Sequence, residues 1–233
     1  MGEILLEARN VRKMFGAYPA LDNFNVSIES GKIIGLLGPN GSGKSTFIKM
    51  CNGILQPSSG EIFIGGNPVG VETKKIVSYL PERTYLDKNM TPVDLVHYFG
   101  DFYDDFDAKK AFDMLESLRI NPRAKMKTMS KGTKEKVQLI LVMSRNAKLY
   151  MLDEPIGGVD PAARDYILNT IISNYNPDAS VIISTHLISD IENILDDVIF
   201  IQNGVLRLHK SVDEIREMEG KSVDALFREV FRC

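Results

Sequence analysis

Residues 38–45 carry the clearest chemistry in this chain of 233 residues. They read Gly-Pro-Asn-Gly-Ser-Gly-Lys-Ser, which fits the G-x-x-x-x-G-K-[ST] pattern of a phosphate-binding loop at every fixed position. The apolar run before them, at 33–37, predicts a buried parallel strand, and residues 46–50 can continue as a helix. Because this order of strand, loop and helix is the context that the pattern needs, we predict that the chain binds a nucleoside triphosphate.

The loop would hold phosphate mainly through its backbone. The N–H groups of residues 41–44 would converge on a β-phosphate at a helix N-terminus, where the partial positive charge favours an anion. Lys44 would reach the β- and γ-phosphates, and Ser45 would place its hydroxyl on Mg²⁺. A chance match to the pattern, on the order of one in a hundred at ordinary glycine content, is the alternative. The residues that we expect to bind nucleotide in this loop are Asn40, Gly41, Ser42, Gly43, Lys44, Ser45 and Thr46.

Two adjacent acids, Asp153 and Glu154, follow the apolar run at 149–152. Ligands bind at the carboxyl edge of a parallel sheet, and this pair would lie there. Asp153 can hold Mg²⁺ through water, and Glu154 can accept a proton from an attacking water. A strand that simply runs out into solvent is the alternative, but two acids that close a buried strand would need a charged partner such as Lys44.

Composition limits the class of protein. The apolar fraction is 44% and the charged fraction 25%, as in soluble globular proteins. A net charge of −3 gives no reason to expect a nucleic acid partner. Cys51 and Cys233 lie far apart and form no metal-binding pattern, which favours a reduced, cytosolic setting. The sequence shows neither a signal peptide nor an apolar run of 18 residues, so we expect a soluble chain.

The pattern of apolar residues predicts an α/β chain with strands on both sides of a helical segment. We expect strands at 4–8, 24–28, 32–37, 61–64, 76–80, 149–152, 181–184 and 198–201, and a hairpin from the last one to 205–208. Thr91-Pro92 is a typical helix start, and 107–118 has helical spacing. We therefore predict one domain over 1–233 with a helical subdomain inserted at about 84–147, and a helical tail after residue 211.

With these elements in place, the whole chain resembles the ATP-binding subunit of an ABC transporter. The segment Gly157-Gly158-Val159-Asp160 is similar to the D-loop of that family, and His186, after the strand at 181–184, matches its switch histidine. The resemblance implies a P-loop NTPase core with a mainly parallel sheet, an N-terminal antiparallel β subdomain and the inserted helical subdomain. It implies ATP and Mg²⁺ as cofactors and Glu154, His186 and Lys44 as catalytic residues. A purely structural role for His186 is the alternative.

Two motifs depart from the family pattern. The signature loop, commonly Leu-Ser-Gly-Gly-Gln, reads Met-Ser-Lys-Gly-Thr at 129–133, so that Ser130 and Gly132 are kept. The resemblance implies that these two residues, with Lys131, act on the nucleotide of a second subunit. Lys131 would add attraction for the γ-phosphate or only tune a weaker site, and a basic loop that caps a helix is the bland alternative. Glu82 stands where the family usually has glutamine, and its carboxylate can still bind Mg²⁺.

The family stacks an aromatic side chain on the adenine. Phe15 matches best in spacing and Tyr18 is second, although packing in the core would explain either residue equally simply. The sequence contains no Asn-Lys-x-Asp motif that would read guanine.

The resemblance implies that two such chains close head to tail around two ATP molecules. It makes the chain a peripheral protein on the inner face of the cell membrane that drives separate membrane-spanning subunits. Its second ATPase subunit would be identical or related. The aromatic and acidic stretch at 97–107 and the Ser-Lys-Gly signature resemble bacterial ABC-2 exporters. A soluble ABC ATPase, for example in iron–sulfur cofactor assembly, is the main alternative, and a small-molecule kinase is a weaker one.

Overall fold

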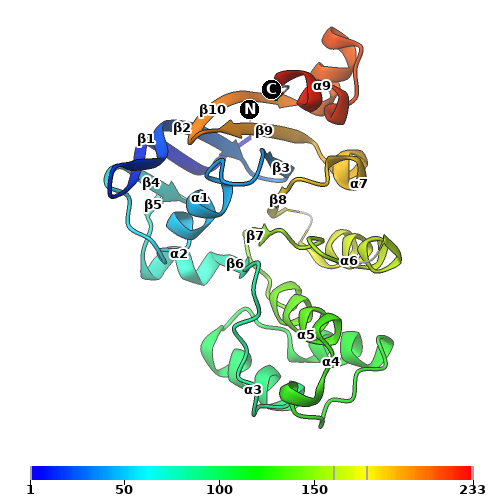
Figure 1. Ribbon diagram of the computed structural model, residues 1–233. Coiled ribbons are helices and arrows are strands. Elements are labelled where there is room, and N and C mark those ends of the chain that lie inside the picture. The colour runs from blue at the N-terminus through cyan, green and yellow to red at the C-terminus, as the bar shows by residue number, and fades with distance from the viewer. Residues whose placement is uncertain (1, 160, 177, 232–233) are drawn as a thin grey trace.

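The computed structural model describes residues 2–159, 161–176 and 178–231, and these residues form two sheets (Figure 1). The first sheet is antiparallel, with strand order β2-β1-β4-β5. Its strands are β1 (Ile4–Phe15), β2 (Tyr18–Glu29), β4 (Ser59–Ile64) and β5 (Asn67–Pro68). The N-terminal antiparallel β subdomain expected from the sequence is thus confirmed.

The second sheet carries the candidate site and has the strand order β10-β9-β3-β8-β7-β6. Only the β9–β10 pair is antiparallel, so the mainly parallel sheet is also confirmed. Its strands are β3 (Ile33–Leu37), β6 (Val77–Leu80), β7 (Leu149–Asp153), β8 (Ser180–Thr185), β9 (Asp197–Gln202) and β10 (Val205–Ser211). β3, β7 and β8 are buried along their whole length, as their nearly continuous apolar sequences require.

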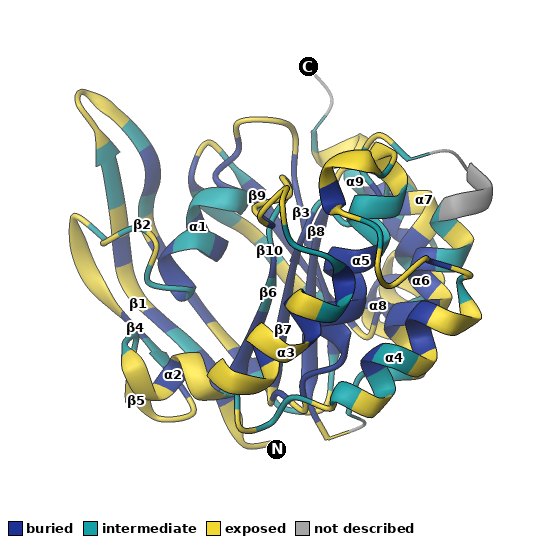
Figure 2. Cartoon of the chain, turned by 90° about the horizontal axis from the view of Figure 1, so that it is seen from below, coloured by how far each residue is buried: buried dark blue, intermediate teal, exposed yellow. Residues whose placement is uncertain are grey.

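Buried apolar residues pack on both faces of the parallel sheet. Figure 2 shows its central strands coloured as buried. Helix α1 (Lys44–Cys51) packs between the two sheets, where the ring of Phe47 lies 4.9 Å from that of Phe24. The opposite face is covered by helices that include α6 (Pro161–Asn174), α7 (Ile188–Ile191) and α9 (Val223–Val230). These two layers hold the loop between β3 and α1 at the sheet edge.

Helices α3 (Pro92–Phe102), α4 (Ala108–Ser117) and α5 (Lys131–Met143) lie between β6 and β7 in the chain and beside the sheet edge in space (Figure 1). A 3-10 turn, Met126–Thr128, precedes α5. Each helix begins at a side-chain cap. The Thr91 hydroxyl accepts from the N–H of Asp94, the Asp107 carboxylate caps α4, and the Ser130 hydroxyl caps α5. The inserted helical segment is confirmed, while its bounds at 84–147 stay a prediction.

The structure differs from the predicted elements mainly at their ends. β1 continues to Phe15 and β2 already begins at Tyr18, so both strands are longer than the sequence predicts. Register shifts and the left-handed residues Asn10 and Asn23 interrupt the alternation of apolar and polar residues by which a strand is predicted. Ile76 ends a helix, α2 (Val71–Ile76), that was not predicted. The helical tail is present as α8 (Val212–Glu214), a π-helical turn over Ile215–Glu219, and α9.

A buried arginine joins the helical segment to the sheet. Arg145 is 3% exposed, and its guanidinium donates to both carboxylate oxygens of Asp105, at 2.9 and 3.1 Å. It also donates to the carbonyls of Val77, at 2.6 Å, and Lys75, at 2.7 Å, and lies 3.9 Å from the ring centre of Tyr103. Arg145 therefore fastens the α3–α4 connection to the α2–β6 connection, next to the start of β7.

We predict that Arg145→Met lowers the free energy of unfolding by about 3 kcal/mol, since it leaves Asp105 and two carbonyls without their donor. Denaturation in urea, followed by circular dichroism, measures the change. Arg123→Met is the matched control, because Arg123 is exposed and should cost less than about 0.5 kcal/mol. Equal losses in the two variants would contradict the assignment.

Candidate nucleotide-binding site

The glycine-rich loop connects β3 to α1 in a conformation that needs glycine. Gly43 has φ of 112° and precedes the first helical residue, Lys44. A Cβ atom on Gly43 would lie 2.6 Å from the carbonyl oxygen of Ala20, and one on Gly38 would lie 2.2 Å from that of Ile201. The loop is therefore pressed against β2 and β9, and it leads into the N-terminus of α1, where backbone N–H groups favour an anion.

Lys44, the first residue of α1, has a buried side chain that folds back onto the loop. Its Nζ donates to the carbonyls of Gly38, at 2.8 Å, and Pro39, at 3.3 Å, and lies 3.8 Å from a carboxylate oxygen of Glu154. Burial lowers the pKa of Lys44, and the charges of Glu154 and Asp153 act against that shift. Burial is the largest cause of this pKa shift, so a bound anion such as phosphate would stabilise the charged form of this lysine.

Asp153 ends β7 as a fully buried carboxylate. Its Oδ1 accepts from the hydroxyls of Ser45, at 2.9 Å, and Ser184, at 2.7 Å. Its Oδ2 has no hydrogen-bond partner among the described residues. A hydroxyl beside a carboxylate with one unused oxygen fits the oxygen ligands and bound waters that Mg²⁺ prefers. Among the described residues, no group of three or more His, Cys, Asp or Glu side chains is placed to hold a metal ion by itself.

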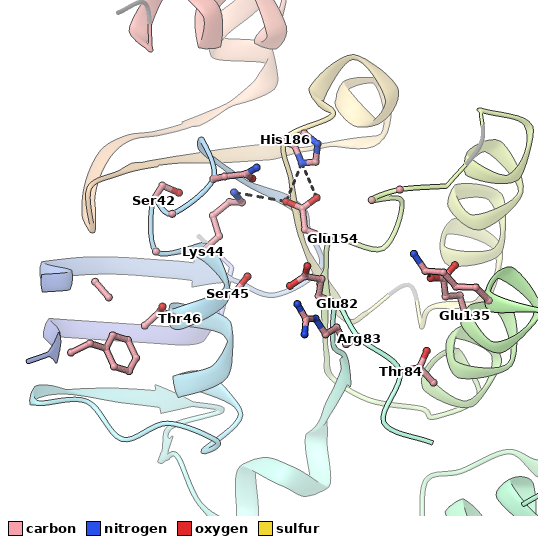
Figure 3. Close-up of a pocket in the computed structure, with 18 of the residues that line it drawn as sticks. Ser42, Lys44, Ser45, Thr46, Glu82, Arg83, Thr84, Glu135, Glu154 and His186 are labelled. Carbon is pink, nitrogen blue, oxygen red and sulfur yellow. Dashed lines mark hydrogen bonds and ion pairs between the residues drawn. The ribbon is translucent and has the colours of Figure 1, made fainter. Parts of the chain in front are cut away.

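Glu154 projects from the strand end toward Lys44 and His186 (Figure 3). Its φ is 51°, a left-handed conformation that is rare outside glycine, and its N–H donates to the carbonyl of Ser184 at 3.0 Å. His186 Nδ1 lies 3.1 Å from Glu154 Oε2. The strained backbone thus turns the carboxylate into the cavity, where it can accept a proton from water.

A cavity of about 970 Å³ brings most of the predicted residues together. Phe15 and Tyr18, at the tip of the β1–β2 hairpin, are 49% and 56% exposed, so packing in the core is excluded for both. The Tyr18 hydroxyl lies 3.4 Å from the carbonyl oxygen of Gly41. The predicted residues that line the cavity are Phe15, Tyr18, Asn40, Gly41, Ser42, Gly43, Lys44, Ser45, Thr46, Glu82, Lys131, Glu154 and His186.

Three of the predicted residues that the structure describes are not among those that line this cavity. Asp153 lies behind Glu154 and lines a smaller cavity. Ser130 and Gly132 are exposed at the start of α5, and a Cβ atom on Gly132 would meet no atom within 4 Å. Lys131, between these two residues, does line the cavity, and its Nζ lies 3.7 Å from Glu135. Asp160, the last residue of the D-loop segment, lies outside the described residues.

The structure adds residues that sequence reasoning missed. Ser184 supports both acids, and it lies directly opposite Asp153 in the β7–β8 pairing. Lys134 and Glu135 line the large cavity with Lys131, from which they are one helical turn away. That helical spacing was a signal in the sequence, whereas the pairing of Ser184 with Asp153 needs the strand order. Arg83, Thr84, Gly157 and Gly158 also line the cavity.

Comparison with known proteins agrees with this geometry. The sequence model of the ABC transporter family matches residues 21–157, more than half of the chain. The chain belongs to the ABC transporter family. It is an ATPase of that family.

Two relatives and one solved structure illustrate the family membership. The linearmycin resistance ATP-binding protein LnrL of Bacillus subtilis (strain 168) is 32% identical over 208 residues, which are 86% of this chain and 67% of the relative. The SkfA peptide export ATP-binding protein SkfE of the same strain is 29% identical over 219 residues, 91% of this chain and 92% of the relative. A solved ATP-binding subunit of an ABC transporter superposes with a TM-score of 0.88 at 28% identity, over 98% and 100% of the two chains.

Within the described ranges of this ABC protein, no helix is both long and apolar enough to cross a membrane.

We predict that Lys44→Ala weakens ATP binding about 10- to 100-fold, the range expected when a charged hydrogen-bond donor to phosphate is lost. Titration with a fluorescent ATP analogue measures the dissociation constant. Lys49→Ala is the control, because Lys49 is on the same helix but does not line this cavity. An unchanged affinity in Lys44→Ala would remove the residue from this role.

Proposed function

We propose that two ATPase subunits of this kind close around two Mg²⁺-bound ATP molecules, and that hydrolysis drives export through separate membrane-spanning subunits. The observation that carries the dimer is the position of the signature loop. Ser130 and Gly132 are exposed and lie outside the cavity of their own chain, and that cavity opens to solvent. A second chain, identical or related, would bring its own Ser130 to the open side.

Each site residue has a proposed role. Lys44 holds the β- and γ-phosphates, Glu154 accepts the proton of the attacking water, and His186 contacts the γ-phosphate and orients Glu154. Bound Mg²⁺ would neutralise charge on the β- and γ-phosphates. Ser45 and Glu82 would hold it directly and Asp153 through water. The adenine would stack on Phe15 or Tyr18.

The residues supplied in trans would stabilise charge across the interface. The Ser130 hydroxyl and the Gly132 N–H lie at the N-terminus of α5, where the helix dipole favours a phosphate. Lys131 would add an exposed cation, since its side chain is 82% exposed. Asp160 belongs to the segment that resembles the D-loop of the family and lies outside the described residues. We propose that residues 1–233 act as one ATPase domain, with the segment at about 84–147 as its helical insertion.

The export role rests on the kind of relatives that the chain has and on one exposed surface. SkfE is by name a peptide export protein, and LnrL is a resistance protein. On α3, Tyr98 and Phe102 are 49% and 67% exposed with ring centres 4.6 Å apart, whereas Phe99 is buried below them. Such an exposed aromatic pair fits docking to a membrane subunit at the cytoplasmic face. The net charge of −3 gives no support for a nucleic acid partner.

We predict that Glu154→Gln lowers ATP turnover at least about 100-fold, the usual effect of losing a general base. Binding of ATP should persist, so that ATP-dependent dimers accumulate. Phosphate release and size-exclusion chromatography with light scattering give the two readouts. Glu72→Gln makes the same chemical change on exposed α2 and should leave both unchanged. If Glu154→Gln kept half of the turnover, Glu154 would not be the base.

Mixing two inactive variants tests whether the signature loop acts in trans. Ser130→Asp keeps an acceptor that caps α5 but places a negative charge against the γ-phosphate. A mixed dimer with Lys44→Ala contains one intact site and one doubly altered site. We predict that an equimolar mixture recovers up to about a quarter of wild-type turnover, because half of randomly paired two-fold dimers are mixed and each has one working site. Turnover equal to the sum of the separate variants would refute action in trans.

The transport role is tested by the fractions in which the full chain is found. We expect it to sediment with membranes and to copurify with a multi-span membrane protein. Copurification with soluble assembly factors and absence from membranes would instead support the iron–sulfur alternative.

A further inference from the structure

A second cavity, of about 40 Å³, is lined by Glu154 and by residues from the middle of α5. Its walls include the segment after β6 with Pro81 and Glu82, the end of β7 with Asp153, and α5 with Gln138. Asp153 is 1% exposed and Gln138 is 3% exposed. The cavity therefore connects the proposed metal ligands to the helix that carries the signature loop.

Two buried oxygen atoms on these walls lack a hydrogen-bond partner among the described residues: Asp153 Oδ2 and Gln138 Oε1. Both are acceptors, so neither can satisfy the other, and buried acceptors left unpaired are costly. A water molecule has two O–H donors, and the cavity is large enough to hold one. The atoms thus match a bridging water better than any side chain that lines the cavity.

The other end of the Gln138 amide is already fixed. Its Nε2 donates to the carbonyl oxygen of Pro81 at 3.2 Å, directly before Glu82. The amide orientation follows from this bond, because a carbonyl can only accept. Gln138 consequently connects the backbone beside one proposed metal ligand, Glu82, with the cavity that contains the other, Asp153.

We infer that Gln138 is a positioning residue that makes α5 respond to metal at the nucleotide site. Its Oε1 accepts a hydrogen bond from a water held in the hydration shell of the metal by Asp153, while its Nε2 holds Pro81. Metal-bound water is a stronger donor than free water, so metal binding tightens the link to α5 and to Ser130 at its start. This inference rests on the proposed Mg²⁺–ATP site.

Thermal unfolding in the presence of a non-hydrolysable ATP analogue tests the link without turnover. The measured quantity is the rise in melting temperature when excess EDTA is replaced by Mg²⁺. Gln138→Met keeps the size of the side chain but removes the amide. We expect the affinity of this variant for the analogue in EDTA to stay within about twofold of wild type. The increase in affinity that Mg²⁺ produces should be about fivefold smaller than in wild type, which is the factor for one lost hydrogen bond of about 1 kcal/mol. Its melting-temperature rise should shrink accordingly.

Gln138→Glu makes the opposite change and keeps the test decisive if Gln138→Met folds poorly. It places a carboxylate beside Asp153, where like charges repel unless a divalent cation is near. We expect a lower melting temperature in EDTA and a larger rise with Mg²⁺ than in wild type. Gln56→Glu is the matched control, since Gln56 lines neither cavity and should behave as wild type.

The results separate this inference from the proposed function. A rise that is largest in Gln138→Glu, intermediate in wild type and Gln56→Glu, and smallest in Gln138→Met supports the link. Equal rises in all four proteins would overturn the role of Gln138 while leaving the metal site intact. If wild type showed no rise with Mg²⁺, the proposed metal site itself would be wrong, and the inference would be wrong with it.

Discussion

The buried charge of Asp153 is the constraint on which the site depends. A carboxylate that is 1% exposed is costly unless donors surround it, and here the donors are the hydroxyls of Ser45 and Ser184. One comes from the first turn of α1 and the other from β8. The two hydrogen bonds to this one carboxylate therefore hold α1 against β7. The bond from Ser184 also fits the register of β7 and β8, in which Asp153 and Ser184 are paired. Ser45 and Ser184 are far apart in the chain, and both contact Asp153 because its buried carboxylate requires hydrogen-bond donors.

The geometry of Glu154 follows from the same support. Ser184 accepts the N–H of Glu154 through both its carbonyl and its hydroxyl oxygen, at 3.0 and 3.1 Å, and this holds the residue in its left-handed conformation. The strain turns the carboxylate away from the strand direction and toward Lys44 and His186. Without phosphate, Glu154 supplies the nearest opposite charge to a buried lysine. A bound phosphate would replace Glu154 as the opposite charge beside Lys44. The carboxylate of Glu154 would then be available to accept a proton from water.

Much of this site could be predicted from sequence because it is encoded locally. The loop at 38–45 and the pair Asp153-Glu154 each follow a short apolar strand, and that order alone places them at one sheet edge. Ser184 and Gln138 could not be predicted, since their roles depend on which strands are neighbours and how α5 packs. For Phe15 and Tyr18, core packing and exposure were equally consistent with the sequence. The structure excludes core packing, because the register of the β1–β2 hairpin places Phe15 and Tyr18 at its exposed tip.

Helix α5 is held unequally at its two ends, and this difference matters for how the site can act on a partner. Its C-terminal end is fastened by the Ser78–Val142 hydrogen bond and by Arg145 just beyond it, whereas Ser130 at the other end is exposed. Thirteen residues of helix span about 20 Å. A tilt of about 10° about the fastened end would therefore move Ser130 by roughly 3 Å over that length. Such a displacement exceeds the tolerance of a hydrogen bond to phosphate. Contacts along the middle of α5, such as the hydrogen bond from Gln138 to the carbonyl of Pro81, would limit such a tilt.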